Sequence, residues 1–116
     1  MTTLYGISNC DTCRKARKFL DGAGVSYRFH DLRQDGLSSE QAHRWLAAVG
    51  ADALVNRRST TWRGLSETDR SRIANDSVAD LLLSHPTLIK RPVLETGNTV
   101  HVGFRDADYQ ALLELD

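Results

Sequence analysis

Cysteine is scarce in this sequence, and long apolar runs and an excess of charge of either sign are missing altogether. Only 2 of the 116 residues are Cys, and a chain of this length folds around a hydrophobic core without disulfide staples. No stretch has the length of a membrane span, and the first residues lack the basic region and apolar core of a signal peptide. We therefore expect a cytoplasmic protein with no membrane partner.

The charges balance, with 15 basic and 15 acidic residues and a formal net charge of zero. A neutral chain has no overall attraction to nucleic acid, so we expect no direct nucleic-acid binding, and any recognition of anions must come from local clusters. Hydrophobic residues make up 41% of the sequence, and no linker or low-complexity segment interrupts it. We therefore expect residues 1–116 to form a single domain.

Both cysteines lie in one motif, Cys10-Asp11-Thr12-Cys13. A short β-prone run over residues 3–7 precedes the motif, and apolar residues recur at helical spacing from Cys13 onward. A strand therefore delivers both thiols to a helix N-terminus, where backbone N–H groups and the helix dipole stabilise a thiolate. If the pKa of a thiol fell there from about 8.5 to about 6.5, its thiolate share at pH 7 would rise from roughly 3% to roughly 75%. We expect Cys10 to be the more exposed nucleophile and Cys13, one turn into the helix, to be the resolving thiol.

Two other interpretations of the motif compete with this one. A Cys-x-x-Cys pair can be half of a zinc site, but no two of the four histidines have the close spacing of a second structural ligand pair, so we expect no metal. The second interpretation is a pair of inert, buried small residues, and it stays open for Cys13 alone.

Hydrophobic periodicity and capping signals predict the order β-α-β, a helical middle, then β-β-α. Gly22 and Gly24 close the first helix, and the alternation of Val25, Tyr27 and Phe29 predicts the second strand. In the middle of the chain, the predicted helix starts are Ser38 with Gln41 as a capping box, Ser66, and Asn75 or Ser77, and the predicted stop is His85-Pro86.

The C-terminal part is predicted to be a hairpin followed by a helix. Strands over residues 91–94 and 99–102 flank a turn at 95–98, and Asp106 is expected to cap a helix that turns Tyr109 inward. A cysteine pair after the first strand, a proline that opens a late strand and the order βαβ…ββα indicate an α/β, thioredoxin-like fold. Its mixed four-stranded sheet would carry an all-helical insertion at about residues 38–85. Because a proline in this place tends to be cis and to pack against the cysteine turn, we predict a cis Arg91-Pro92 bond.

Four segments together resemble the arsenate reductase (ArsC)/Spx superfamily, and within it the YffB-like branch of small glutathione-coupled thiol reductases. The resemblance depends on the order and the separations of these segments, and it covers nearly the whole chain. The segments are Leu4–Ala16, Phe29–Asp31 with Asp35–Leu37, Asn56–Arg63, and His85–Pro86 with Ile89–Val93.

The resemblance implies a role for several residues. Family reductases use one nucleophilic cysteine after the first strand, which matches Cys10, and they hold the oxyanion with arginines, of which Arg91 and Arg105 match two. The third arginine position falls on Asn56, with Arg57 and Arg58 directly after it, and this departure weakens the case for arsenate. The full candidate set for binding glutathione or an oxyanion is Arg91, Arg105, Arg57, Arg58, Asn9, Asp11, Thr12, Arg14 and Pro92.

From these residues we expect a thiol-dependent reductase without a bound cofactor. The Cys10 thiolate would attack a disulfide or an oxyanion such as arsenate, and either glutathione, as co-substrate, or Cys13 would resolve the adduct. Glutaredoxin or a protein disulfide is a further expected partner. Two alternatives remain: a redox-switched regulator similar to Spx that uses a Cys10-Cys13 disulfide to alter a protein-binding surface, and a family member that has lost activity and serves as an interaction module.

Overall fold

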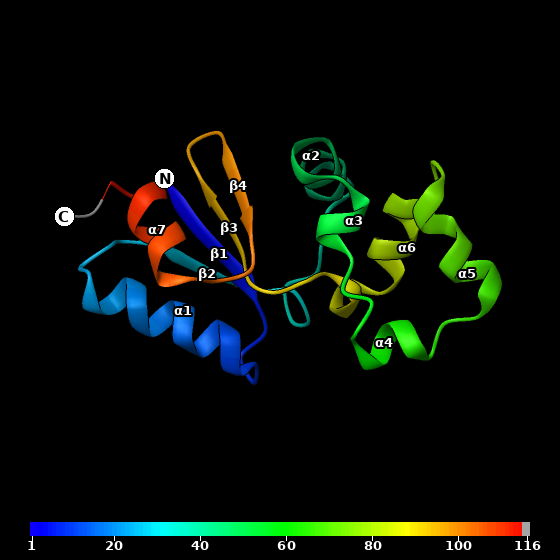
Figure 1. The fold of residues 1–116 in the computed structure, drawn as a ribbon, viewed down its shortest axis with the longest axis horizontal. Helices are drawn as coiled ribbons and strands as arrows, with labels where there is room; N and C mark the ends of the chain where they lie inside the picture. The colour runs from blue at the N-terminus through cyan, green and yellow to red at the C-terminus, as the bar shows by residue number, and fades with distance from the viewer. Residues whose placement is uncertain (115–116) are drawn as a thin grey trace. The chain divides into compact units, whose positions relative to one another are not determined.

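The computed structural model describes residues 1–114 of the chain, which divides into two compact units. The sheet unit joins Met1–Asp31 to Arg91–Asp116, and the helical unit is Leu32–Lys90. The helical unit is thus several residues longer at each end than the predicted insertion at 38–85. Figure 1 shows the two units by their colours, blue to cyan with orange to red for the first and green to yellow for the second.

The sheet unit contains four strands in the order β2-β1-β3-β4. Strand β1 runs parallel to β2 and antiparallel to β3, and β3 forms a hairpin with β4. The bounds are β1 Thr2–Gly6, α1 Asp11–Gly22, β2 Arg28–Asp31, β3 Val93–Thr96, β4 Thr99–Val102 and α7 Asp106–Leu112. This mixed sheet with its βαβ and ββα halves is the thioredoxin-like fold that the sequence predicts.

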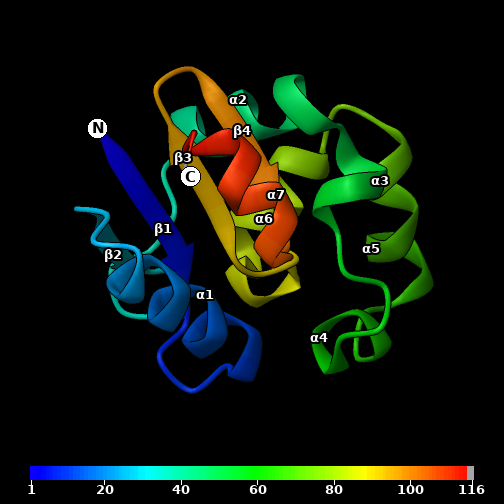
Figure 2. The same ribbon diagram turned by 60° about the vertical axis from the view of Figure 1, so that its left-hand side comes forward.

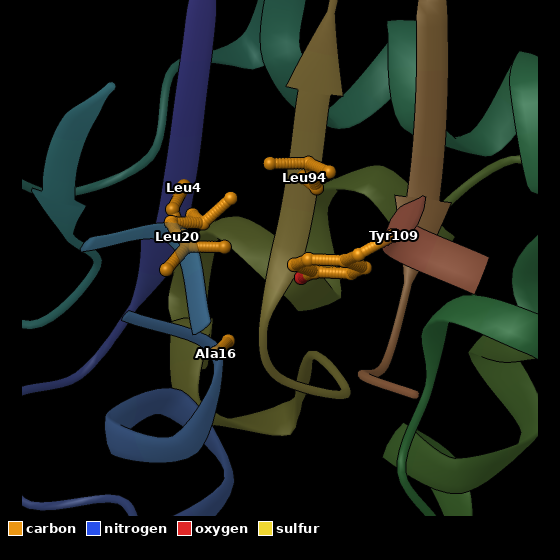
Figure 3. Packing of buried hydrophobic residues seen from close by; sticks show 5 residues of the cluster. All are labelled: Leu4, Ala16, Leu20, Leu94 and Tyr109. Atoms are coloured by element: carbon orange, nitrogen blue, oxygen red, sulfur yellow. The ribbon is translucent and has the colours of Figure 1, made fainter. Parts of the chain in front are cut away.

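Helices α1 and α7 pack against one face of the sheet, which is turned toward the viewer in Figure 2. Leu4 and Leu94 are register partners on β1 and β3 and therefore point to the same face. With Ala16 and Leu20 of α1 and Tyr109 of α7 they form a fully buried cluster, shown in Figure 3. This cluster holds the N-terminal turn of α1, and so the thiols, against the end of β1.

Four predicted boundaries in the sheet unit are wrong by a few residues, and one of them is the start of β3, which begins at Val93 rather than Arg91. Strand β2 begins at Arg28 rather than Val25, because pairing with β1 starts only at Thr3 opposite Arg28. The hairpin loop is two residues long instead of four, since β3 continues to Thr96, which pairs with Thr99, and Gly97 takes a φ of 58° that suits a two-residue turn.

The start of the last helix also differs from the prediction. Arg105 is the N-cap residue of α7, and Asp106 is the first helical residue. Asp106 makes no capping hydrogen bond, but its charge lies in the first turn, where the helix dipole favours an anion. Tyr109 is buried as expected, and Leu112 and Leu113 pack partly buried against the same cluster.

The helical unit is built from short helices whose starts follow the predicted capping residues. Ser38 accepts a hydrogen bond from the Gln41 N–H while the Gln41 side chain bonds back to the Ser38 N–H, which completes the capping box. Ser66 caps its helix by accepting a hydrogen bond from the Asp69 N–H. The bounds are α2 Ser39–Val49, α3 Ala51–Leu54, α4 Thr60–Arg63, α5 Glu67–Ser71 and α6 Val78–Ser84, with 3-10 turns at Arg72–Ala74 and Pro86–Leu88.

Within this unit Trp45 of α2 is fully buried, together with leucines of α3 and α6. Ser77 is the N-cap residue of α6 but makes no capping bond, and its N–H and hydroxyl both donate to the Asn75 side chain instead. In the described part of the chain, no helix is both long and apolar enough to cross a membrane.

Candidate active site

The two thiols lie where β1 hands over to α1. Cys10 is the N-cap residue of α1, with extended backbone angles, and its carbonyl accepts the first helical hydrogen bond from the Arg14 N–H at 2.9 Å. Cys10 is partly exposed, whereas Cys13 is 1% exposed on the buried face of the helix. Both thiols are free. One thiol of the pair is therefore accessible and the other lies in the core, as the sequence predicts.

The surroundings of Cys10 favour its thiolate. Partial burial by itself raises the pKa of Cys10, but this effect is outweighed by the N–H and S–H groups of Cys13 and by the Arg91 guanidinium, which hydrogen-bonds to the sulfur and adds positive charge. The net result is a pKa of Cys10 below its usual value. In the reduced structure the thiol makes no formal capping bond with the helix. The lowered pKa depends on groups that would strengthen their contacts as charge develops on the sulfur.

The second thiol has the opposite character. Burial, and next the hydrogen bond and charge of Cys10, raise the pKa of Cys13 to about 12, despite opposing contributions from the Ile7 backbone and Arg91. The pKa values of these two thiols, three positions apart in the sequence, are therefore shifted in opposite directions because their environments differ. Of the two thiols, Cys10 is therefore the one that its surroundings favour as a thiolate.

Arg91 and Pro92 return the chain to the cysteine turn. The Arg91-Pro92 bond is cis, as predicted, and Pro92 immediately precedes β3. Arg91 thus reaches Cys10 from the segment that leads into β3, the strand next to β1 in the sheet. Because a guanidinium is always charged and offers several donors, it can hold an anion beside the sulfur as well as stabilise the thiolate.

Two residues that were not predicted to belong to the site support the segments that carry the cysteines. Asp31, 6% exposed at the end of β2, accepts a hydrogen bond from the Ser8 N–H at 3.2 Å and so ties down the loop that carries Cys10. Gly6 of β1 lies against Cys13, because a Cβ at this position would be 2.5 Å from the Cys13 sulfur. The two residues are neighbours because the parallel register of β1 and β2 places Gly6 opposite Asp31.

The remaining predicted ligand-binding residues of the sheet unit are exposed, and some of them form ion pairs with nearby side chains. Asn9 and Thr12 are exposed, and Arg14 forms an ion pair with Asp11. Arg105 is 80% exposed and binds the Asp108 carboxylate through two nitrogens, at 3.0 and 3.3 Å, an interaction that raises the pKa of Arg105. The structure thus brings Cys10, Cys13 and Arg91 together, and it gives Arg14 and Arg105 acidic partners of their own. A contact of Pro92 with the thiols stays a prediction.

The candidates of the helical unit lie in the loop between α3 and α4. Arg57 pairs with Asp52 at 2.9 Å, and its guanidinium lies 5.8 Å from the ring centroid of Trp62. The Asn56 side chain accepts a hydrogen bond from the Arg58 N–H at 3.0 Å, so the carboxamide at the expected arginine position stabilises its own loop. The roles of Arg57 and Arg58 toward a ligand stay predictions.

Metal ions in proteins are commonly held by several His, Cys, Asp or Glu side chains. Residues 1–114 contain no group of three or more His, Cys, Asp and Glu side chains arranged to hold an ion. The groups that the structure does place at the site are a thiol pair and an adjacent guanidinium.

Comparison with known proteins reveals relatives along almost the whole chain. An uncharacterized protein of Haemophilus influenzae is 40% identical over 111 residues, which cover 96% of this chain and 97% of that protein. The global transcriptional regulator Spx of Streptococcus agalactiae is 26% identical over 118 residues, covering 100% of this chain and 85% of the regulator.

Solved structures agree with these relatives. The YFFB protein is 42% identical with a TM-score of 0.89, and the match covers 96% of this chain and 97% of that one. An arsenate reductase (ArsC) related protein from Brucella melitensis is 44% identical with a TM-score of 0.75, covering 98% and 95% of the two chains. The family model described as the ArsC family matches residues 5–112. This chain, with its thiol pair at the start of α1 and its cis proline before β3, therefore belongs to the ArsC family.

Proposed function

We propose that this protein is a thiol-dependent reductase in which Cys10 is the nucleophile and glutathione is the co-substrate. The observation that carries the proposal is the asymmetry of the thiols: Cys10 is accessible with a lowered pKa, and Cys13 is buried with a pKa raised to about 12. An inert pair of structural cysteines has no need for such a difference. Membership of a family that includes proteins named arsenate reductase-related supports the same class of chemistry.

The proposed reaction begins with attack of the Cys10 thiolate on one sulfur of a mixed disulfide between glutathione and a substrate. The substrate leaves as a thiolate and takes up a proton, and Cys10 becomes joined to glutathione. A second glutathione thiolate then attacks the glutathionyl sulfur, which releases oxidised glutathione and restores Cys10. With Cys13 as the resolving thiol, a Cys10-Cys13 disulfide forms instead, and glutaredoxin or another dithiol resets it.

Arg91 supports glutathione as the co-substrate. Glutathione carries two carboxylates, and a guanidinium next to the nucleophile can pair with one of them while stabilising negative charge on sulfur. Arsenate is the weaker substrate candidate, because the third arginine expected from the family falls on Asn56, whose side chain is bonded within its own loop. Such a reductase would work in the reducing cytoplasm.

The intact mass of the reduced protein after exposure to oxidised glutathione tests the proposal. We expect an adduct of one glutathione on the wild-type protein or on Cys13→Ser, and none on Cys10→Ser. If Cys10→Ser forms the adduct as readily as the wild type, Cys10 is not the nucleophile. The Cys13→Ser protein is the matched control, since it loses a thiol of the same motif but keeps the one with the lowered pKa.

A second candidate function is a redox-switched regulator like Spx, favoured by the similarity to Spx over the full length of this chain. In that case a Cys10-Cys13 disulfide would form and persist, and the protein would bind a partner without turnover. The same mass measurement shows whether this disulfide forms, because the protein then loses two hydrogens and keeps no adduct. A reductase in which Cys13 resolves the adduct gives the same mass, so turnover must be measured as well. Continuous consumption of glutathione in the presence of a disulfide substrate would show that the protein is an enzyme and not a switch.

A further inference from the structure

A buried phenol lies behind the thiol pair. Tyr109 of α7 is 0% exposed, and its ring is held by edge contacts with Phe104 at 4.7 Å, His101 at 5.9 Å and Phe19 at 6.0 Å between centroids. Its hydroxyl oxygen is buried and has no hydrogen-bond partner among residues 1–114. A buried hydroxyl without a partner costs free energy, so its presence in a core position that Phe would fill requires a reason.

The hydroxyl faces the helix that carries the resolving thiol. In Figure 3 the ring extends from α7 across β3 toward α1, and the oxygen lies at its far end. The α1 face that meets this cluster is formed by Cys13, Ala16 and Leu20, which are the buried residues of the helix. Burial raises the pKa of Tyr109, and the charge of Cys13 raises it further, so the phenol and the thiol act on each other electrostatically.

The Tyr109 hydroxyl is therefore available to donate a hydrogen bond to a neighbouring group that becomes charged. A phenol whose pKa is raised keeps its proton when a neighbouring sulfur becomes anionic, and a neutral hydroxyl can turn its O–H toward the new charge. The other ionisable groups that act on Cys13 are Cys10 and Arg91. While Cys10 carries a mixed disulfide, its sulfur has no charge. Arg91 also interacts with the Cys10 sulfur, so Tyr109 is a separate hydrogen-bond donor on the core side of Cys13.

We propose that Tyr109 is the positioning residue for the resolving thiol. Its hydroxyl donates a hydrogen bond to the Cys13 sulfur as that sulfur attacks the mixed disulfide on Cys10. The inference rests on the resolving role of Cys13 in the proposed function. In this step Cys13 loses its proton to solvent, the bond between the Cys10 sulfur and the departing thiol breaks, and the Cys10-Cys13 bond forms. The departing sulfur receives the electron pair and takes up a proton, so the two cysteines are oxidised and the departing group is reduced. Tyr109 keeps its own proton throughout.

A chromogenic aromatic disulfide, 5,5′-dithiobis(2-nitrobenzoate), reports the two thiols separately. Attack by Cys10 releases a first coloured thiolate and leaves the second on Cys10, and attack by Cys13 then releases the second. Stopped-flow absorbance therefore gives a first phase for the nucleophile and a second phase for the resolving thiol, without any need for glutathione. The wild type is compared with Tyr109→Phe, Cys13→Ser and the matched control Tyr27→Phe.

Tyr27→Phe makes the same chemical change in the same core. Tyr27 packs against the cluster that contains Tyr109, but its hydroxyl pairs with the Arg17 guanidinium at 3.5 Å. The rates of all the proteins are measured in the same buffers over one common range of pH. Thermal unfolding of each variant accompanies the rates, and Tyr109→Phe is expected to be at least as stable as the wild type, since it loses an unpaired hydroxyl.

We expect Tyr109→Phe to slow the second phase about 10- to 100-fold, as for loss of a hydrogen bond to a charged group. Its pH profile should move to higher pH, and the first phase should stay within about twofold of the wild type. A second phase that depends on Cys13 but is equally fast in Tyr109→Phe would overturn the role of Tyr109 alone. A wild type with no second phase would overturn the resolving role of Cys13 and this inference with it, and a missing first phase would remove Cys10 as the nucleophile.

Discussion

Gly6→Ala measures how closely β1 approaches the thiol on α1. An alanine Cβ at this position would lie 2.5 Å from the Cys13 sulfur and 3.3 Å from the Cys13 Cβ, whereas ordinary contact begins at 3.4 Å. The sulfur or the strand must therefore move by about 0.9 Å. Because Cys13 is only 1% exposed, its side chain has no open space to enter.

The expected cost follows from packing. Inserting a methyl group into a filled core costs about 1–3 kcal/mol, and the lower backbone entropy of alanine in the unfolded chain returns about 0.5–1 kcal/mol. We expect a net loss of about 1–2 kcal/mol in the free energy of unfolding. For a domain of this size that corresponds to a melting temperature lower by about 4–8 °C.

Urea and thermal unfolding of Gly6→Ala test this, with Gly22→Ala as the control. Gly22 is the last residue of α1 and has nothing within 4 Å of an added Cβ, so alanine there should be neutral or stabilising. In a Cys13→Ala background the sulfur is gone and the nearest contact relaxes to 3.3 Å, so the cost of Gly6→Ala should fall below about 0.5 kcal/mol. An equal cost in both backgrounds would refute the contact between Gly6 and the sulfur.

Three further predictions concern the thiols and the helical unit. Arg91→Gln removes the hydrogen bond and the charge that favour the Cys10 thiolate, so the pH profile of Cys10 alkylation should move to higher pH; an unchanged profile would contradict the contact. Between the ordinary thiol pKa of 9.0 and about 12 the folded protein keeps a Cys13 proton that the unfolded chain gives up, so stability should fall as the pH rises through this range and Cys13→Ala should weaken that fall in urea unfolding. Ser38→Ala deletes the acceptor of the α2 capping box and should cost about 1 kcal/mol in the same assay; no loss would mean that the box does not stabilise α2.

Local signals account for the parts of the fold that the sequence predicts well. The capping box at Ser38, the end of α1 at Gly22 and the cis bond at Pro92 each depend on residues a few positions apart or on the chemistry of proline. The predicted exposures of Cys10 and Cys13 follow from their places at the N-cap and one turn later on a helix with one apolar face. Strand ends were less predictable, because pairing decides where a strand begins, and Val25 fits the alternation without pairing with β1.

The neighbours of the thiols come from distant parts of the chain. Asp31 reaches the cysteine loop because β2 lies parallel to β1, and Arg91 reaches Cys10 because β3 lies on the other side of β1. Nothing near Arg105 in the sequence distinguishes an anion-binding arginine from one paired with Asp108, which is the arrangement observed. A side chain's partner depends on three-dimensional packing, and the family resemblance indicates only which positions to consider.

The sequence alone determined that two thiols stand at a helix start after a strand, in a neutral chain whose segments resemble the ArsC family, because composition and short spacing carry that information. Only the tertiary structure decided which neighbours shift the pKa values of the two thiols. Burial of Cys13 against Gly6 and the core raises its pKa, whereas Arg91 and Cys13 lower that of Cys10. The hydroxyl of Tyr109, 96 positions after Cys13 in the sequence, faces the same helix only because α1 and α7 share one face of the sheet.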